Sequence, residues 1–236
     1  MTDIHCHLLN NVDDGSSSFE ESLLLLNQEI KQGVKTVFLT PHFYNPRKTI
    51  YSDEEIVEKF LEFKEKTRNL DINIYLGAEC YYGKKFLKAL EDRTVRGYNN
   101  SKTLLLEFSL SRPMEIDDCV YKTILKGYDV ILAHPCRYPE ITFDDIKDIK
   151  ISKAKIQINA SSILNRKNKR VRSLALKLLK AHLVDFVASD AHNTKRDVEL
   201  DSAYNFVSKK YGKDYAKEIF IENQNKLIAS VIKSEE

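Results

Sequence analysis

The sequence lacks an apolar run of the roughly 20 residues that a bilayer-spanning helix needs, and it begins with no basic-then-apolar signal segment. Neither sign of charge dominates, since 37 Lys and Arg residues stand against 35 Asp and Glu residues. No C-x-x-C pair occurs among the four cysteines, which are Cys6, Cys80, Cys119 and Cys136. The sequence therefore predicts a cytoplasmic protein with free thiols, no insertion into a membrane and no nucleic-acid partner.

The 236 residues also contain no Pro-, Gly- or Ser-rich linker and no internal repeat, and the chain is long enough to bury a full core. Seven short runs rich in Val, Ile, Leu and Phe are almost continuously apolar, which is typical of parallel strands covered on both faces. These predicted strands are Thr2–His5, Lys35–Thr40, Ile72–Gly77, Thr103–Phe108, Asp129–Ala133, Lys155–Asn159 and Asp185–Ser189.

Helical patterns separate most of these runs, and two of them open with the capping-box pattern S-x-x-E at Ser18 and Ser52. The predicted helices run from Ser18 to Gly33, from Ser52 to about Asn69, from about Ile116 to Gly127 and over Val171–Ala181. The β-α order predicts a single α/β, barrel-like domain over residues 1–236, closed by helices over about 197–236.

Imidazole or carboxylate side chains stand where six of the seven apolar runs give way to loops, and the run Lys155–Asn159 ends in the amide of Asn159. The C-terminal ends of parallel barrel strands open on one face, so these side chains should come together. A buried imidazole or carboxylate is costly unless it is paired or bound to a cation. One such residue alone is often a satisfied edge residue, but six strand ends together favour a metal site. The candidate ligands are His5, His7, His42, Glu79, Glu107, His134, Asp190 and His192.

These side chains offer imidazoles and carboxylates in numbers too large for one ion and suited to two or three divalent ions about 3.5–4 Å apart. Asp14, in an Asp-Asp-Gly turn, is a further candidate, although Asp-Gly by default marks only a turn. Mixed imidazole and carboxylate ligands favour Mn, Fe or Zn over Mg or Ca. Such a cluster generates hydroxide at neutral pH and stabilises an oxyanion, which indicates hydrolysis, most often of a phosphate ester.

Cationic side chains near the candidate ligands could bind the phosphate. Arg137 follows His134 by three residues, and its planar guanidinium can contact two phosphate oxygens. Lys195 and Arg196, just after His192, are weaker candidates because lone basic residues usually lie on the surface. The basic run over residues 166–172 is usually a solvated face, with the binding of acidic partners as the alternative.

The motifs follow one another along the chain as His5-x-His7, Val12-Asp13-Asp14-Gly15, Thr40-Pro41-His42, Gly77-x-Glu79, Leu106-Glu107-Phe108, Ala133-His134-Pro135-x-Arg137-Tyr138 and Ala188-Ser189-Asp190-Ala191-His192-Asn193. In this order and spacing they resemble the PHP (polymerase and histidinol phosphatase) superfamily. Within it, the sequence is similar to the bacterial manganese-dependent tyrosine-protein phosphatases of capsular and exopolysaccharide clusters, the CpsB/CapC group.

The resemblance implies a distorted (β/α)7 barrel with a site for two or three manganese ions, with Fe, Zn or Mg as alternatives. The implied ligands are His5, His7, Glu79 and Asp190 for one ion, Glu79, Glu107 and His134 for a second, and Asp14, His42 and His192 for a third. Arg137 would bind the phosphate, assisted by Arg196. The implied substrate is phosphotyrosine on the tail of a partner bacterial tyrosine kinase that controls polysaccharide export. Oligomerisation is compatible with the sequence.

The sequence departs from the family pattern at two cysteines. Cys6 stands where a serine is usual, and Cys136 replaces the usual glutamate before Arg137. On an extended strand Cys6 points away from its neighbours, which favours a small buried residue. A Cys6 thiolate that reached the cluster would instead shift the metal preference toward Zn.

The sequence also bears on four alternative functions. A cysteine-based phosphatase needs an arginine six residues after its nucleophile, and the residues at those positions are Val12, Phe86, Leu125 and Thr142. A nuclease is disfavoured by the near-neutral charge. A catalytically idle, kinase-binding barrel is disfavoured because it has no need of a costly ligand cluster. A PHP phosphoesterase that acts on a small metabolite such as histidinol phosphate stays open as the alternative.

Overall fold

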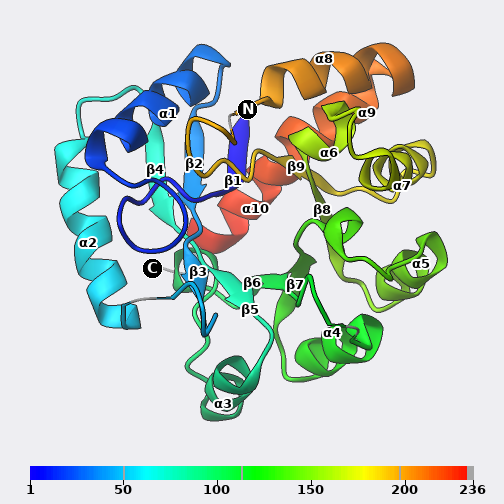
Figure 1. Ribbon diagram of the computed structural model, residues 1–236, viewed down its shortest axis with the longest axis horizontal. Coiled ribbons are helices and arrows are strands. Elements are labelled where there is room, and N and C mark those ends of the chain that lie inside the picture. Colours follow the sequence, from blue (N-terminus) through cyan, green and yellow to red (C-terminus); the bar gives the residue numbers. More distant parts are fainter. Residues whose placement is uncertain (50, 113, 197, 233–236) are drawn as a thin grey trace.

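Parallel strands form the centre of the molecule, and helices surround them (Figure 1). The computed structural model describes residues 1–49, 51–112, 114–196 and 198–232. One sheet has the order β1 (Thr2–Cys6), β2 (Thr36–Leu39) and β4 (Asn73–Leu76). The other has the order β3 (His42–Phe43), β5 (Glu79–Tyr81), β6 (Thr103–Glu107), β7 (Asp129–Leu132), β8 (Lys155–Asn159) and β9 (Phe186–Ala188).

The two sheets close into a distorted ring. A parallel bridge joins Cys6 at the end of β1 to Ala191 beyond β9, and the His7 N–H donates to the Ala191 carbonyl at 2.8 Å. On the other side, β3 continues the course of β2, and β5 continues that of β4. The strands therefore follow the β-α order expected of an α/β barrel-like fold.

The second and third predicted strands are each followed, after a short break, by a further strand, which corrects the prediction that His42 and Glu79 stand in loops beyond strand ends. His42 instead opens β3, and Glu79 opens β5. The first break falls at Pro41, which has no N–H to donate to a ladder. The second falls at Gly77, where a Cβ atom would lie 2.9 Å from Thr40 Cγ2. His42 and Glu79, the first residues after the breaks, lie beside each other, with 2.8 Å between His42 Nδ1 and Glu79 Oε2.

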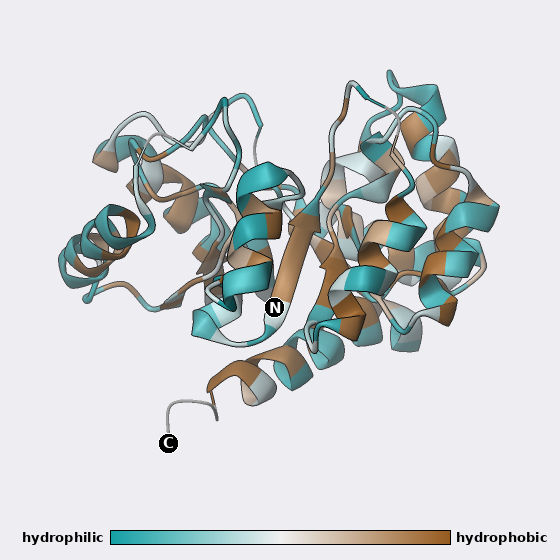
Figure 2. Cartoon of the chain, turned by 90° about the horizontal axis from the view of Figure 1, so that it is seen from below, coloured by the Kyte–Doolittle hydropathy of each residue, from teal (hydrophilic) through white to brown (hydrophobic). Residues whose placement is uncertain are grey.

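Helices cover the outside of the ring (Figure 1). They are α1 (Phe19–Lys31), α2 (Asp53–Lys66), α3 (Lys84–Asp92), α4 (Ile116–Leu125), α5 (Phe143–Ile151), α6 (Ala160–Leu164) and α7 (Lys169–Lys180). In Figure 2 the strands in the middle are mostly brown, whereas the helices carry teal residues on their outer sides. The helices α3, α5 and α6 were not predicted from the sequence, and α2 ends at Lys66 instead of at about Asn69.

The predicted capping boxes differ in outcome. At α2 the box is complete, because Ser52 accepts from the Glu55 N–H and the Glu55 carboxylate accepts from the Ser52 N–H. At α1 the Ser18 side chain accepts from the Glu21 N–H, but the Glu21 carboxylate accepts from Ser17 and from the Thr194 N–H. The reciprocal half of that box is therefore wrong, since Glu21 ties the helix to the loop after His192.

The end of the barrel opposite the ligands is filled by the last helix. After β9 come α8 (Leu200–Tyr211), α9 (Lys213–Lys217), a π-helical stretch (Glu218–Glu222) and α10 (Asn223–Ile232). Leu227 and Val231 of α10 are buried against Ile4 of β1 and Phe38 of β2, and Figure 1 shows α10 passing behind the strands. Residues 197 and 233–236 of the predicted closing segment lie outside the described residues. Within the described parts, no helix is long and apolar enough to span a bilayer.

Candidate metal centre and phosphate site

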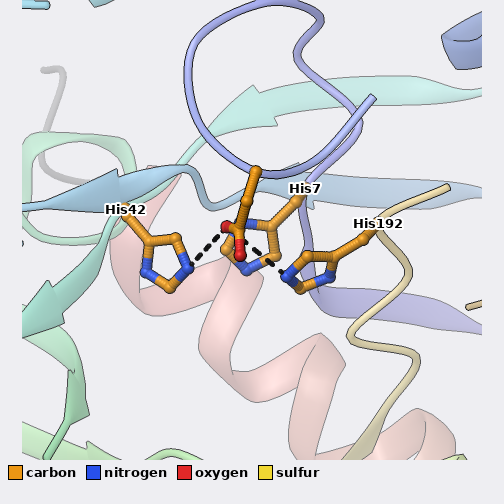
Figure 3. A group of neighbouring side chains, drawn as sticks. His7, His42 and His192 are labelled. Carbon is orange, nitrogen blue, oxygen red and sulfur yellow. Dashed lines mark ion pairs between the residues drawn. The ribbon is translucent and has the colours of Figure 1, made fainter. Parts of the chain in front are cut away.

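All of the predicted metal ligands lie in one cluster, in which every side chain is buried except that of Asp14, which is 44% exposed. Their ligand atoms form four overlapping groups, and in each group these atoms lie within 4.8 Å of one another. The groups are His7 with Asp14, His42 and His192; His5 with His7 and Asp190; His5 with Glu79 and His134; and His42 with Glu79 and Glu107. Figure 3 shows His7, His42 and His192 pointing toward a common centre.

Glu79 occupies the middle of the cluster, and its side chain is 1% exposed. Its Oε1 lies 2.7 Å from His134 Nε2 and 3.3 Å from His5 Nε2. Its Oε2 lies 2.8 Å from His42 Nδ1 and 3.3 Å from His7 Nε2. Since each carboxylate oxygen faces a different pair of imidazoles, Glu79 has the geometry of a carboxylate that bridges two ions.

Several buried atoms of the cluster lack a hydrogen-bond partner among the described residues. His42 Nδ1 and Glu79 Oε2 are close, but they are not aligned for a hydrogen bond. The other unpaired atoms in the cluster are Glu107 Oε2, His134 Nδ1 and Asp190 Oδ1. Unpaired buried polar atoms are rare and costly. His42 Nδ1 lies 2.8 Å from Glu79 Oε2 and 3.5 Å from Glu107 Oε2. Because these unpaired atoms lie close together and are typical ligand atoms, the residues present fit a group of divalent cations.

The imidazoles of the cluster have divergent proton affinities. Burial alone would lower the pKa of His7, but the Asp13 carboxylate raises it to about 9. Burial opposes charge on His42 as well, but Glu79 and Asp14 raise its pKa to about 10. The opposite holds for His134, whose pKa is lowered by burial to about 4. In the metal-free protein His7 and His42 are therefore protonated, and their positive charges balance the carboxylates. Bound divalent cations would supply this positive charge in their place.

The carboxylate of Asp190 divides its two oxygens between different partners. Oδ2 accepts from Arg137 Nη1 at 2.9 Å, from Arg196 Nη2 at 2.7 Å and from Asn159 Nδ2 at 2.6 Å. Oδ1 has no donor and lies 3.5 Å from His5 Nε2. Both arginines predicted from the sequence therefore lie beside the cluster, with their side chains 28% and 39% exposed, respectively. Lys195 is exposed and does not reach the cluster.

A family model for capsular polysaccharide synthesis proteins, CpsB/CapC, matches residues 1–229 of the sequence. The chain belongs to the CpsB/CapC family. The tyrosine-protein phosphatase CpsB of Streptococcus pneumoniae is 33% identical over 241 residues, which cover 97% of this chain and 98% of that protein. One of the solved structures of YwqE from Bacillus subtilis and CpsB from Streptococcus pneumoniae, which are metal-dependent tyrosine phosphatases, matches with a TM-score of 0.82 and 28% identity over 92% of this chain and 90% of that one.

A histidinol phosphate phosphatase from Lactococcus lactis shares the fold alone, with a TM-score of 0.56 and 15% identity over 89% of this chain and 93% of that one. The family and the α/β barrel-like fold class predicted from the sequence are confirmed. The enzyme class predicted from the sequence, a tyrosine-protein phosphatase, is the one that the CpsB/CapC relatives carry.

Asp13 is a residue of this site that belongs to one of the sequence motifs but was assigned no role there. Its Oδ2 lies 2.7 Å from His7 Nδ1 and accepts from the His42 N–H at 2.9 Å. The next turn residue, Gly15, has no room for a side chain, because a Cβ atom there would lie 2.2 Å from the His7 carbonyl oxygen. A carboxylate behind an imidazole fixes the tautomer of a ligating histidine. Since a ligating histidine commonly needs such a carboxylate partner, Asp13, six residues after His7, could have been identified from the sequence.

Two amide side chains on β8 orient the cluster from behind. Gln157 Oε1 accepts from the His134 N–H at 3.1 Å and lies 3.2 Å from His5 Nδ1. Gln157 Nε2 donates to Asn159 Oδ1 at 2.9 Å, and Asn159 in turn donates to Asp190. Both side chains face the barrel interior because residues two apart on a strand share a face. Polar residues at alternate positions of an apolar strand were the available signal.

Lys48 was also not predicted. Its Nζ lies 2.9 Å from Asp14 Oδ2 and 2.8 Å from His42 Nε2. It comes from the loop after β3, and nothing in the sequence distinguishes it from an ordinary surface lysine. Its ammonium group adds positive charge beside the carboxylate of Asp14.

None of the cysteines reaches the cluster. Cys6 Sγ lies 3.4 Å from the Phe38 carbonyl oxygen, and Cys80 Sγ lies 3.3 Å from that of Arg96. Burial raises the pKa of the Cys136 thiol to about 12 and that of Cys6 well above its ordinary value. The expectation that Cys6 is a small buried residue is met, and the alternative of a thiolate ligand is not supported.

Arg170 holds the turn that carries Arg137. Its guanidinium donates to the carbonyl oxygens of Cys136 at 3.0 Å, Arg137 at 3.3 Å and Tyr138 at 3.1 Å. The turn begins at His134, which has a φ of 32° in the left-handed region. The interpretation of the whole basic run as a solvated face is therefore wrong for Arg170, which is a positioning residue.

We expect Arg170→Ala to lower kcat/KM for a phosphate ester about tenfold, mainly through a higher KM, because Arg137 loses its fixed position. Metal content should stay unchanged, since Arg170 contacts no candidate ligand. Arg170→Lys should recover part of the loss by restoring a donor to the same carbonyl groups. Steady-state kinetics with elemental analysis tests this expectation, and equal kinetics of wild type and Arg170→Ala would contradict it.

Proposed function

We propose that this protein is a metal-dependent tyrosine-protein phosphatase that removes phosphate from a cognate bacterial tyrosine kinase of a capsular or exopolysaccharide system. The observation that carries the proposal is the convergence of all predicted ligands at one end of the barrel, beside two guanidinium groups on Asp190. Membership of the CpsB/CapC family supports the choice of phosphotyrosine over other phosphate esters.

The geometric groups support a distribution of ligands over two or three ions. We assign His5, His7, Glu79 and Asp190 to one ion, Glu79, Glu107 and His134 to a second, and Asp14, His42 and His192 to a third. The third set lies within one of the four groups, whereas the first two combine members of different groups, with 3.3 Å from Glu79 to His5 and to His7 and 4.0 Å from Glu107 to His134. Manganese is the proposed metal, and Fe and Zn suit the same mixed ligands. When bound, such ions stabilise the charge on phosphate oxygens and lower the pKa of water to near neutrality.

The chain's own residues bind and orient the phosphate ester. Arg137 and Arg196 lie at the surface end of the cluster, and each can turn a free N–H toward a phosphate oxygen while Asp190 holds its other edge. Asp13 and Gln157 fix the imidazoles of His7 and His5 from behind. The leaving phenolate has a conjugate acid with a pKa near 10, so a strong general acid is unnecessary.

A cysteine nucleophile does not fit the same site. Burial raises the pKa of each cysteine thiol, and none of the four lies among the ligand groups of the described residues. Vanadate, which targets cysteine phosphatases, should therefore inhibit this protein poorly in comparison with a chelator.

The decisive experiment compares three substrates in protein stripped of metal and then resupplied with Mn²⁺. They are a phosphotyrosine peptide, p-nitrophenyl phosphate and histidinol phosphate. We expect turnover of the peptide only after metal is returned, with two or three bound ions by elemental analysis. Turnover of the small esters without the peptide would instead indicate a metabolite phosphatase on the same barrel.

A further inference from the structure

A groove of about 800 Å³ leads away from the candidate active site. Its inner end is formed by Arg137, Asp190 and Arg196, which belong to the phosphate site. Its outer part runs along the loop that joins α6 to α7, where Arg166 and Lys167 line it, and Lys195 lines it from the loop after β9. The groove thus connects the site of the phosphate to a surface that the proposed reaction leaves unexplained.

Away from the phosphate site, the groove is lined by three cationic side chains, those of Arg166, Lys167 and Lys195, against the single carboxylate of Glu199, although the whole chain has a net charge of only +2. Arg166, Lys167 and Lys195 are exposed, and none of them forms an ion pair with a described residue. Some exposed lysines elsewhere pair with a carboxylate, as Lys88 does with Asp92. The cationic groups of the groove are therefore available to a ligand of opposite charge.

The lining favours a peptide over a nucleic acid as that ligand. Single-stranded nucleic acids bind through stacking of bases on aromatic side chains, and the lining contains no aromatic residue. It does contain Ser161, Asn165 and Asn168, whose side chains can hydrogen-bond to an extended backbone. When the phosphate of a phosphotyrosine peptide lies at Arg137, the residues next to the phosphotyrosine can extend along this groove.

We propose that the groove binds acidic residues that flank the phosphotyrosine of a peptide substrate, with Arg166, Lys167 and Lys195 as their partners. The inference rests on the proposed function, and it adds a determinant of substrate choice to it. Complementary charge at the rim of a site acts mainly on the rate of association and on specificity. We therefore expect the groove to change kcat/KM for peptides that differ in their flanking charges.

The test uses three phosphotyrosine peptides that differ only in two flanking positions on each side, filled with Glu, Ser or Lys. For the metal-loaded protein we expect kcat/KM to be about tenfold higher for the Glu peptide than for the Lys peptide at low salt. Raising the ionic strength should shrink this ratio, because exposed charges are screened. In the double variant Arg166→Glu with Lys167→Glu the preference should vanish or invert.

A matched control is the double variant Lys102→Glu with Lys126→Glu. Both lysines are exposed and stand before β6 and β7, at the other end of the barrel. This variant should keep the wild-type preference for the Glu peptide. The comparison thus separates the effect of charge in the groove from the effect of the net charge of the protein. Hydrolysis of all three peptides at one rate, or an unchanged preference in the groove variant, would overturn the inference alone. Hydrolysis of p-nitrophenyl phosphate with none of the peptides would overturn the proposed function together with it.

Discussion

Chelation of divalent metal is expected to abolish phosphate-ester hydrolysis by this protein, and added Mn²⁺ is expected to restore it. The buried cluster leaves Glu79 Oε2, Glu107 Oε2 and Asp190 Oδ1 without hydrogen-bond donors among the described residues. Charge stabilisation by bound metal contributes several kcal/mol, and each 1.4 kcal/mol changes the rate tenfold. The loss should therefore exceed about a hundredfold, measured with p-nitrophenyl phosphate and a phosphotyrosine peptide.

The metal-free protein should stay folded, because the ligands lie above an apolar core that does not depend on them. Circular dichroism should therefore change little. A ligand at a hundred times its Kd stabilises the native state by about 2.7 kcal/mol, and each kcal/mol shifts the Tm of a chain of this size by about 2–4 °C. We expect the Tm to fall by roughly 5–10 °C for each site emptied.

Metal binding at pH 7 should release protons from His7 and His42. Their pKa values of about 9 and about 10 keep them protonated in the metal-free protein, whereas a ligating imidazole is neutral. The release should diminish as the pH rises through these values. Calorimetric titration in two buffers of different ionisation enthalpy measures it. Full activity in protein that contains no metal by elemental analysis would contradict the whole assignment.

The positions of the ligands could be predicted because each is tied to a local pattern. An apolar run that ends in a polar residue indicates a strand end wherever it occurs, and parallel strand ends share one face of a barrel. Glu107 and His134 were found in this way, and both lie where expected. The break at Gly77 was missed because it depends on a close approach to Thr40, which a single run of sequence does not contain. The break at Pro41 had a local signal, the missing N–H of proline, that was not used.

Residues that act through another residue were harder to predict. Gln157 contacts His5 across 152 positions in the sequence, and Arg170 contacts the carbonyl oxygen of Cys136 across 34. Neither has a motif of its own, so an amide in a strand and an arginine in a basic run were interpreted by their commonest roles. Only the folded arrangement shows that the first orients a candidate ligand and the second holds a turn.

Asp190→Asn is expected to remove metal and activity together, whereas Arg137→Ala is expected to weaken phosphate binding and leave the metal in place. In the first variant, the amide oxygen can still accept from Arg137 and Arg196, but an NH₂ group replaces the oxygen that faces His5. An amide NH₂ is a donor and offers no lone pair to a cation. Activity should fall more than about a hundredfold, with a loss of bound metal by elemental analysis.

In Arg137→Ala, Asp190 keeps the donors of Arg196 and Asn159, so its unpaired oxygen should stay in place. Hydrogen bonds from a charged donor contribute about 1.5–3 kcal/mol, so kcat/KM should fall by roughly tenfold to a hundredfold. His182→Ala is the control, because His182 is exposed and its ring packs 4.1 Å from that of Tyr215, outside the ligand groups. Normal metal content in Asp190→Asn would remove Asp190 from the centre, and metal loss in Arg137→Ala would make Arg137 a structural support of the cluster.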